Sequence, residues 1–294
     1  MPDVSGFDAM ASVYAVLRWC SLAGLVTVGG AALCAVLTRP APPRARLALV
    51  RLLGAAWATG SAGLVGLLLL PGPVSSPAVR LRATLLVLLT ACWALGRYGI
   101  GDPWPTRVQR VLAAGGGAAL VLTAAGCQQL AELPAQAPVV PALLLTQSVQ
   151  LAATAGWLGG SAALAALLIA ARGEPEALAA ARRFTPAGLV SLHLLMAVTS
   201  MQAWQTLGAA PAVLGTPYGR LLLAQLGALT LLLALDALAR ACLHRTPAAP
   251  GGVVRVVLHR TLATQLLLGA ALFAVAGPLP LWSPGFPLPP SPAG

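Results

Sequence analysis

Residues 39–70 read "RPAPPRARLALVRLLGAAWATGSAGLVGLLLL", a loop rich in Pro and Arg followed by a long apolar run. A helix needs about 20 apolar residues to cross the hydrocarbon of a bilayer, and the run 47–70 meets that length. The prolines ahead of it are typical of a turn between helices. This stretch therefore predicts a membrane-spanning helix that follows an arginine-rich loop.

The same pattern recurs along the chain, which is 58% hydrophobic and only 9% charged, with a mean hydropathy of +0.85. A soluble domain carries roughly 25% charged residues, so the expected fold is an all-α polytopic membrane helix bundle. We expect four N-terminal transmembrane helices in 1–140, a second region of four helices in 141–280, and a Pro-rich extracytoplasmic tail in 281–294. The eight expected spans are 12–37, 47–70, 80–99, 108–130, 141–171, 185–208, 218–243 and 256–278.

The arginines give the expected orientation of these spans. Loops on the cytoplasmic side of a membrane carry an excess of Lys and Arg, and the chain contains Arg but no Lys. Loops after the odd-numbered spans hold fourteen arginines, which places both termini outside, on the periplasmic or extracellular face. These are Arg39, Arg44, Arg46, Arg51, Arg97, Arg107, Arg110, Arg172, Arg182, Arg183, Arg240, Arg245, Arg255 and Arg260, against Arg80, Arg82 and Arg220 on the other side.

Several function classes lack their sequence signals. Without Lys the chain has neither a P-loop nor a Schiff-base amine, and no HExxH, nucleophile elbow or carboxylate pair is present. We therefore expect no enzyme activity. Membrane topology explains the net charge of +11 better than nucleic-acid binding does. The five cysteines form no CxxC motif and are typical of small buried apolar residues.

Four ordered motifs lie in the C-terminal half: "GWLGGSAAL" (156–164), "ARRFTPAGLVSL" (181–192), "AWQTLG" (203–208) and "GTPYGRLLLAQLG" (215–227). Over roughly residues 145–245 this order resembles the copper resistance protein D (CopD) family of bacterial inner-membrane proteins. The matching residues are Trp157, Gly159 and Gly160 of a Trp-x-Gly-Gly span, Arg182, Arg183 and Phe184 of an Arg-Arg-Phe loop, and Tyr218, Gly219 and Arg220 at the start of the next helix.

The resemblance implies a copper-handling protein of the bacterial inner membrane that imports copper, with a periplasmic copper chaperone as a possible partner. The family commonly has a His about two turns before the Trp of its motif, a place near Gln150 in this chain, and it tends to have a Lys where this chain has Gln225. These departures favour an alternative, a non-transporting factor that delivers copper to a membrane oxidase or assists its assembly. A haem-binding membrane protein is a more remote alternative, with His193 and His259 as its only conceivable ligand pair.

Polar residues inside a span are costly and suggest function. Gln147, Gln150, Thr154 and Trp157 recur at helical spacing on one face of the fifth span. One interpretation is helix packing, with the glutamines forming interhelical hydrogen bonds. The other is the lining of a transport pathway.

The sixth span carries the only stripe of His and Met in the chain, since His193, Met196 and Met201 follow one another at helical spacing. Thioether, thiolate and imidazole groups suit copper, above all Cu(I), although Met is also a common core residue. Cys20 and Cys127 are expected at the outer half of the bundle and complete the candidate metal residues. On the seventh span, Asp236 and Arg240 stand four residues apart, as in a local ion pair or an intramembrane proton relay.

Overall fold

The computed structural model describes residues 4–37, 43–70, 77–101, 120, 122–126, 141–171, 175–207, 217–245 and 251–276. Within these ranges the secondary structure is helical, without strands, as expected. The main helices are α1 (Val4–Leu37), α2 (Pro43–Leu69), α3 (Pro77–Gly101), α5 (Pro141–Thr154), the π-helical turn η1 (Ala155–Gly159), α6 (Gly160–Ala170), α7 (Pro175–Leu207), α9 (Pro217–Arg245) and α10 (Gly251–Ala276).

Proline marks the start of most of these helices. Pro43, Pro77, Pro141, Pro175 and Pro217 are the first residues of α2, α3, α5, α7 and α9. Proline suits the first turn because its fixed φ angle is helical and its missing N–H would have no partner there. The loops that separate the apolar runs in the sequence therefore also set where each helix begins.

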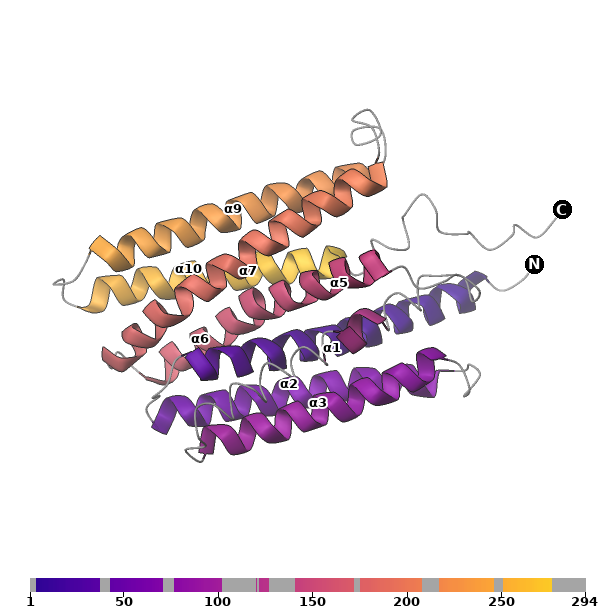
Figure 1. Ribbon diagram of the computed structural model, residues 1–294, viewed down its shortest axis with the longest axis horizontal. Coiled ribbons are helices and arrows are strands. Elements are labelled where there is room, and N and C mark those ends of the chain that lie inside the picture. Colours follow the sequence, from indigo (N-terminus) through magenta and orange to yellow (C-terminus); the bar gives the residue numbers. More distant parts are fainter. Residues whose placement is uncertain are drawn as a thin grey trace.

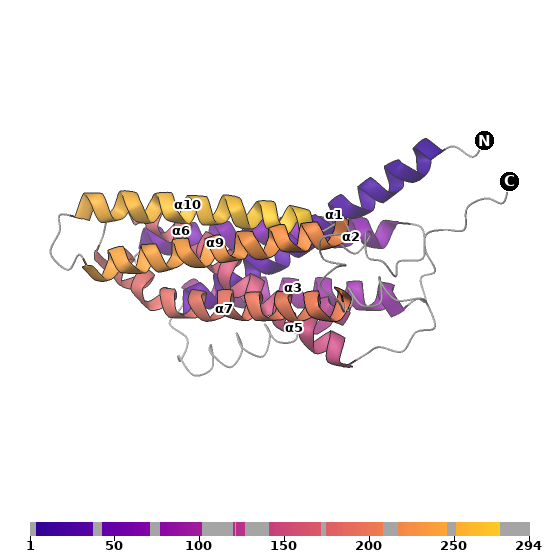
Figure 2. The ribbon, with the colours of Figure 1, turned by 90° about the horizontal axis from the view of Figure 1, so that it is seen from above.

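The helices run roughly along one axis and form a bundle with a central pair (Figures 1 and 2). α1 and the continuous rod of α5, η1 and α6 lie at the centre and contact each other through η1 and α6. α2 and α3 cover one side of this pair, and α7, α9 and α10 cover the other. α1 begins and α10 ends at the same end of the bundle.

Among the described residues, five helical segments are long and apolar enough to cross a membrane: Ser12–Leu37, Arg44–Leu69, Pro77–Arg97, Leu144–Ala170 and Ala179–Met201. The apolar part of α9, Leu222–Leu238, is shorter. These segments support a membrane location, whereas the number of eight spans and the outward termini stay predictions. The expected fourth span, 108–130, falls mostly outside the described residues, and the tail 281–294 falls wholly outside them.

The beginning of α7 differs from the expected span. Hydropathy placed the start at residue 185, with Arg182, Arg183 and Phe184 in a loop, but the helix already begins at Pro175. The intervening sequence, "EALAAARR", consists of strong helix formers. Its charges exclude it from an apolar window without disfavouring a helix, so the Arg-Arg-Phe motif is helical and contributes Phe184 to the core.

Glycines allow the two central helices to touch through their backbones. A Cβ atom on Gly159 would overlap the carbonyl oxygen of Val26, and one on Gly30 would overlap backbone atoms of Ala155, Gly159 and Gly160. A Cβ on Gly160 would lie against the ring of Phe184, 2.5 Å from Cε2. The Gly-Gly pair of the Trp-x-Gly-Gly motif thus serves close packing on two sides, against α1 and against α7.

Candidate functional site

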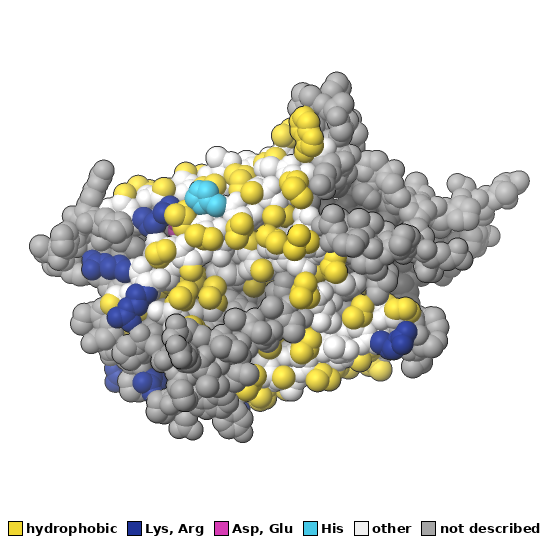
Figure 3. Space-filling model, viewed as in Figure 1, with side chains coloured by type: hydrophobic (Ala, Val, Ile, Leu, Met, Phe, Trp, Pro, Cys, Tyr) yellow, Lys and Arg dark blue, Asp and Glu magenta, His cyan; other side chains and the backbone are white. Residues whose placement is uncertain are grey.

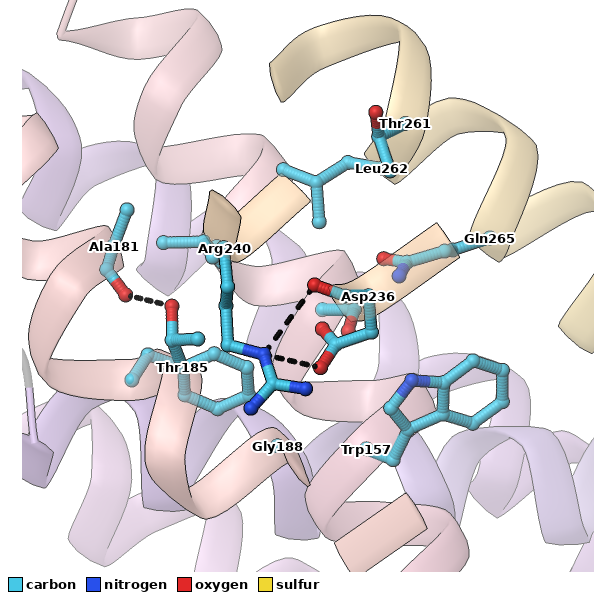
Figure 4. A pocket seen from close by; sticks show the side chains of 12 residues that line it. Trp157, Ala181, Thr185, Gly188, Asp236, Arg240, Thr261, Leu262 and Gln265 are labelled. Atoms are coloured by element: carbon cyan, nitrogen blue, oxygen red, sulfur yellow. Dashed lines mark hydrogen bonds and ion pairs between the residues drawn. The ribbon is translucent and has the colours of Figure 1, made fainter. Parts of the chain in front are cut away.

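A small polar pocket lies where η1 and α6 meet α7, α9 and α10 (Figure 4). Its cavity volume is about 30 Å³. A single water needs roughly 10–15 Å³ measured in this way, so the cavity has room for about two. The polar lining is formed by Trp157, Ser161, Thr185, Asp236, Arg240, Thr261 and Gln265.

Asp236 and Arg240, one turn apart on α9, form the charged part of the pocket. Arg240 Nε lies 3.1 Å from Asp236 Oδ2, and the two side chains are 24% and 16% exposed, so the expected ion pair is present. The same Nε–H donates a hydrogen bond to the backbone carbonyl of Asp236, at 3.3 Å. Oδ2 accepts no hydrogen bond from the described residues. We therefore treat the contact with Oδ2 as electrostatic, because the N–H is shared with the backbone.

Two buried donors face the same cavity, and both residues are 3% exposed. The indole Nε1 of Trp157 donates no hydrogen bond within the described part of the chain. The amide Nε2 of Gln265 makes no hydrogen bond of good geometry there, but its side chain interacts with the carboxylate of Asp236. In Figure 4 the Gln265 amide points toward Asp236 from α10, while Trp157 lies on the far side of the carboxylate. Buried polar groups are normally paired. Water in the cavity is the simplest partner for these two donors and for Oδ2.

Helix irregularities flank the pocket on two sides. The π-helical turn η1 contains Trp157, and such turns occur frequently at functional sites. On the opposite wall, Pro186 lies inside α7 and cannot donate the usual backbone hydrogen bond. Thr185 next to it donates to the carbonyl of Ala181 at 2.7 Å and lines the pocket. The backbone around the pocket is thus less regular than in an ordinary transmembrane helix.

A second layer of unpartnered polar groups lies farther along the same helices. Gln147 Oε1 and Thr199 Oγ1 are buried and make no hydrogen bond with the described residues. Gln147 is ten residues before Trp157, and Thr199 is eleven residues after Gly188, which lines the pocket. At 1.5 Å per residue both are about 15 Å from the pocket level. Since α5 packs against α7, the two layers lie at different depths along the same helices.

Between these layers lies an apolar cluster that contains one thioether. Its buried members are Ala153, Trp157, Leu192, Leu195, Leu229 and Leu232. Met196 packs against this cluster and is half-buried. Of the candidate metal residues that the structure describes, Met196 is therefore the one that packs between the two polar layers.

The other candidate metal residues are not gathered around Met196. His193 is exposed, with Nδ1 2.9 Å from the carbonyl oxygen of Leu189, and Met201 is 47% exposed. Cys20 is half-buried on α1, and Cys127 lies outside the described residues. No group of three His, Cys, Asp or Glu side chains in the described ranges could hold a metal ion. Of the three residues on α7, Met196 therefore packs inside the bundle, whereas His193 and Met201 are exposed.

The polar face expected on the fifth span is only partly buried in the helix bundle. Gln147 and Trp157 are buried, whereas Gln150 and Thr154 are half-buried, and Thr154 donates to the carbonyl of Gln150 at 2.7 Å. The π-helical turn follows Thr154 directly and changes the helical register before Trp157. Farther away, Tyr218 and Gly219 lie in the first turn of α9, and Arg220 is exposed there, well separated in sequence from Asp236.

Sequence reasoning did not single out Gln265, Thr199, Ser161 or Thr185. Gln265 offered a usable signal, because it is a lone strongly polar residue inside the apolar run 256–278. The hydroxyl residues gave no such signal, since Ser and Thr are common in membrane helices and bond to their own backbone.

Comparison with known proteins returned no relative: no family model, no curated protein and no solved structure matches this chain.

Proposed function

We propose that this chain is a copper-handling protein of a bacterial inner membrane, and that it moves copper inward as Cu(I). The observation that supports the proposal is that residues from two separate sequence motifs line the same pocket. Trp157 and Phe184, from two of the motifs that resemble the CopD family, both line the one polar pocket described above. A second polar layer, that of Gln147 and Thr199, lies farther along the same helices, with the apolar cluster that contains Met196 between the two.

The proposed route for copper follows the inward face of α7. The ion would pass Thr199, then the thioether of Met196, and then Trp157 at the pocket. A soft thioether suits Cu(I), and a pathway requires weak sites, because an ion that enters must also leave. The pocket itself offers oxygen and nitrogen groups and no sulfur, so Met196 is the residue to which we assign copper contact.

The proposed orientation has the pocket nearer the cytoplasm. Figure 3 shows most of the visible Arg side chains at one end of the bundle and fewer at the other, with hydrophobic side chains spread over the described part of the face between the ends. Positive charge marks the cytoplasmic side of membrane proteins. With that end inside, the start of α1 and the end of α10 face outward, where a periplasmic copper chaperone could deliver its ion. Several arginines of the loops and helix ends expected on the cytoplasmic side are exposed in the structure: Arg44, Arg46, Arg97, Arg182, Arg183 and Arg260.

Met196→Leu should lower copper accumulation to near the level of cells that carry an empty vector. The exchange nearly conserves volume, so we expect a stability cost below about 1.5 kcal/mol and unchanged protein levels in the membrane. The measurement is the copper content of washed cells that express wild type or variant at equal membrane levels.

Met201→Leu is the matched control, because it removes the same thioether from an exposed position five residues farther along α7. It should leave copper accumulation at the wild-type level. Equal accumulation in wild type and Met196→Leu would remove Met196 from the route. If wild type itself accumulates no more copper than the empty vector, the transport proposal fails, and the copper content of membrane oxidases becomes the test of a delivery function.

A further inference from the structure

The pocket places the carboxylate of Asp236 beside a cavity that is also lined by the N–H donors of Trp157 and Gln265. Copper transport by a thioether does not require this arrangement. The acid of the pocket is also unusual for this chain. The acidic residues are Asp3, Asp8, Asp102, Glu132, Glu174, Glu176 and Asp236, and Asp236 alone falls within an expected span. Acids within membrane helices are rare, and they mark ion pathways and proton relays.

We propose that the pocket is a proton-binding site at which the carboxylate of Asp236 takes up and releases a proton through cavity water. The structure supplies the three elements that such a site needs. Oδ2 is buried and accepts no hydrogen bond from the described residues. The cavity beside it has room for about two waters. Trp157 Nε1–H and Gln265 Nε2–H₂ can donate to those waters and hold them next to Oδ2.

The chemical step is a proton transfer without any change of oxidation state. On uptake, an O–H bond forms at Oδ2, and the cavity water that gives up the proton is restored by a proton from the aqueous side. The ionised carboxylate is compensated by Arg240, whose Nε is 3.1 Å away. After uptake, the guanidinium keeps its hydrogen bond to the backbone carbonyl of Asp236. The protonated carboxyl can then donate to a cavity water or to Gln265 Oε1.

Charged and titratable groups around Asp236 come from its own helix, α9, and from two neighbouring helices, α7 and α10. Arg240 faces it on α9, and the charge of His193 on α7 acts on it electrostatically. On α10, His259 has a buried Nε2 without a partner among the described residues, and it lies two residues before the pocket residue Thr261. The lining from η1 and α6, Trp157 and Ser161, is not titratable.

The inference deepens the proposed function, since proton movement would supply the driving gradient for copper, but proton binding is measurable with no copper present. Infrared difference spectra of the purified protein, recorded while the pH is lowered stepwise, detect the C=O stretch of each protonated carboxyl. We expect wild type to show one more carboxyl band than Asp236→Asn, an exchange that keeps the shape of the side chain. Asp236→Glu should keep the band at a shifted frequency.

Identical spectra of wild type and Asp236→Asn over the whole pH range would overturn the inference. If Asp236→Asn cannot be purified folded, the comparison of wild type with Asp236→Glu decides, because only a carboxyl at this position shifts its band between the two. The failures are distinguishable. An Asp236 band without copper accumulation leaves the proton site standing and removes the transport proposal. Copper accumulation without the band removes the proton site alone.

Discussion

Gly30→Leu should lower the free energy of unfolding by about 3 kcal/mol or more, because the position has no room for any side chain. A Cβ atom there would overlap backbone atoms of Ala155, Gly159 and Gly160. A backbone cannot move aside as a flexible side chain can, so α1 and η1 would have to separate. Overpacking of a core commonly costs about 1–3 kcal/mol, and a clash between two backbones belongs at the upper end of that range. The measurement is thermal unfolding of the detergent-purified protein.

The same exchange at Gly227 is the matched control. A Cβ on Gly227 meets no atom within 4 Å, and the residue is exposed on α9. Gly227→Leu should leave the unfolding temperature unchanged or raise it slightly, because leucine favours helix over glycine. Similar unfolding temperatures for Gly30→Leu and Gly227→Leu would show that α1 and η1 do not touch as described.

Arg240→Met should destabilise the protein by about 3 kcal/mol at neutral pH. Breaking a buried ion pair by removing one partner costs about 3–5 kcal/mol, since it leaves an uncompensated charge. We expect the lower limit because the two side chains keep 24% and 16% exposure. The loss should shrink as the pH is lowered, because a protonated Asp236 carries no charge that needs a partner. Unfolding curves at several pH values check both statements.

The double variant Asp236→Asn with Arg240→Met separates loss of charge balance from loss of packing. Replacement of a buried ion pair by apolar residues of similar volume is often close to neutral for stability. Asp236→Asn removes the charge that Arg240→Met leaves without a partner, so the double variant should recover most of the loss. A double variant as unstable as Arg240→Met alone would assign the effect to packing of the Arg240 side chain. It would also remove the electrostatic argument for the pocket.

Hydropathy alone located the described helices to within a few residues at most ends. Apolar length predicts a transmembrane helix because lipid tolerates no unpaired backbone, and prolines mark the first turns. α7 is the main exception, since residues 176–183 are strong helix formers whose charges keep them out of an apolar window. The Asp236–Arg240 pair was also predictable, because a separation of four residues on a helix determines the contact without any knowledge of neighbouring helices.

The rotation of each helix about its axis could not be predicted in the same way. In lipid both faces of a helix can be apolar, so the pattern does not say which face turns inward. The stripe of His193, Met196 and Met201 shows the consequence, as only Met196 packs inside. The pocket depends on a π-helical turn and on Gln265 from a different helix. The turn and the position of Gln265 both depend on how the helices pack, and the periodicity of residues along one helix does not predict that packing.

Uptake of Cu(I) by purified protein in sealed vesicles tests the central claim most directly, because no other cellular component takes part. Under reducing conditions, we predict faster copper entry into vesicles with wild-type protein than into empty vesicles. Vesicles with Met201→Leu should match wild type, and those with Met196→Leu should match empty vesicles. Copper entry at the same rate into empty vesicles and into vesicles with wild-type protein would contradict the claim that this chain moves copper across a membrane.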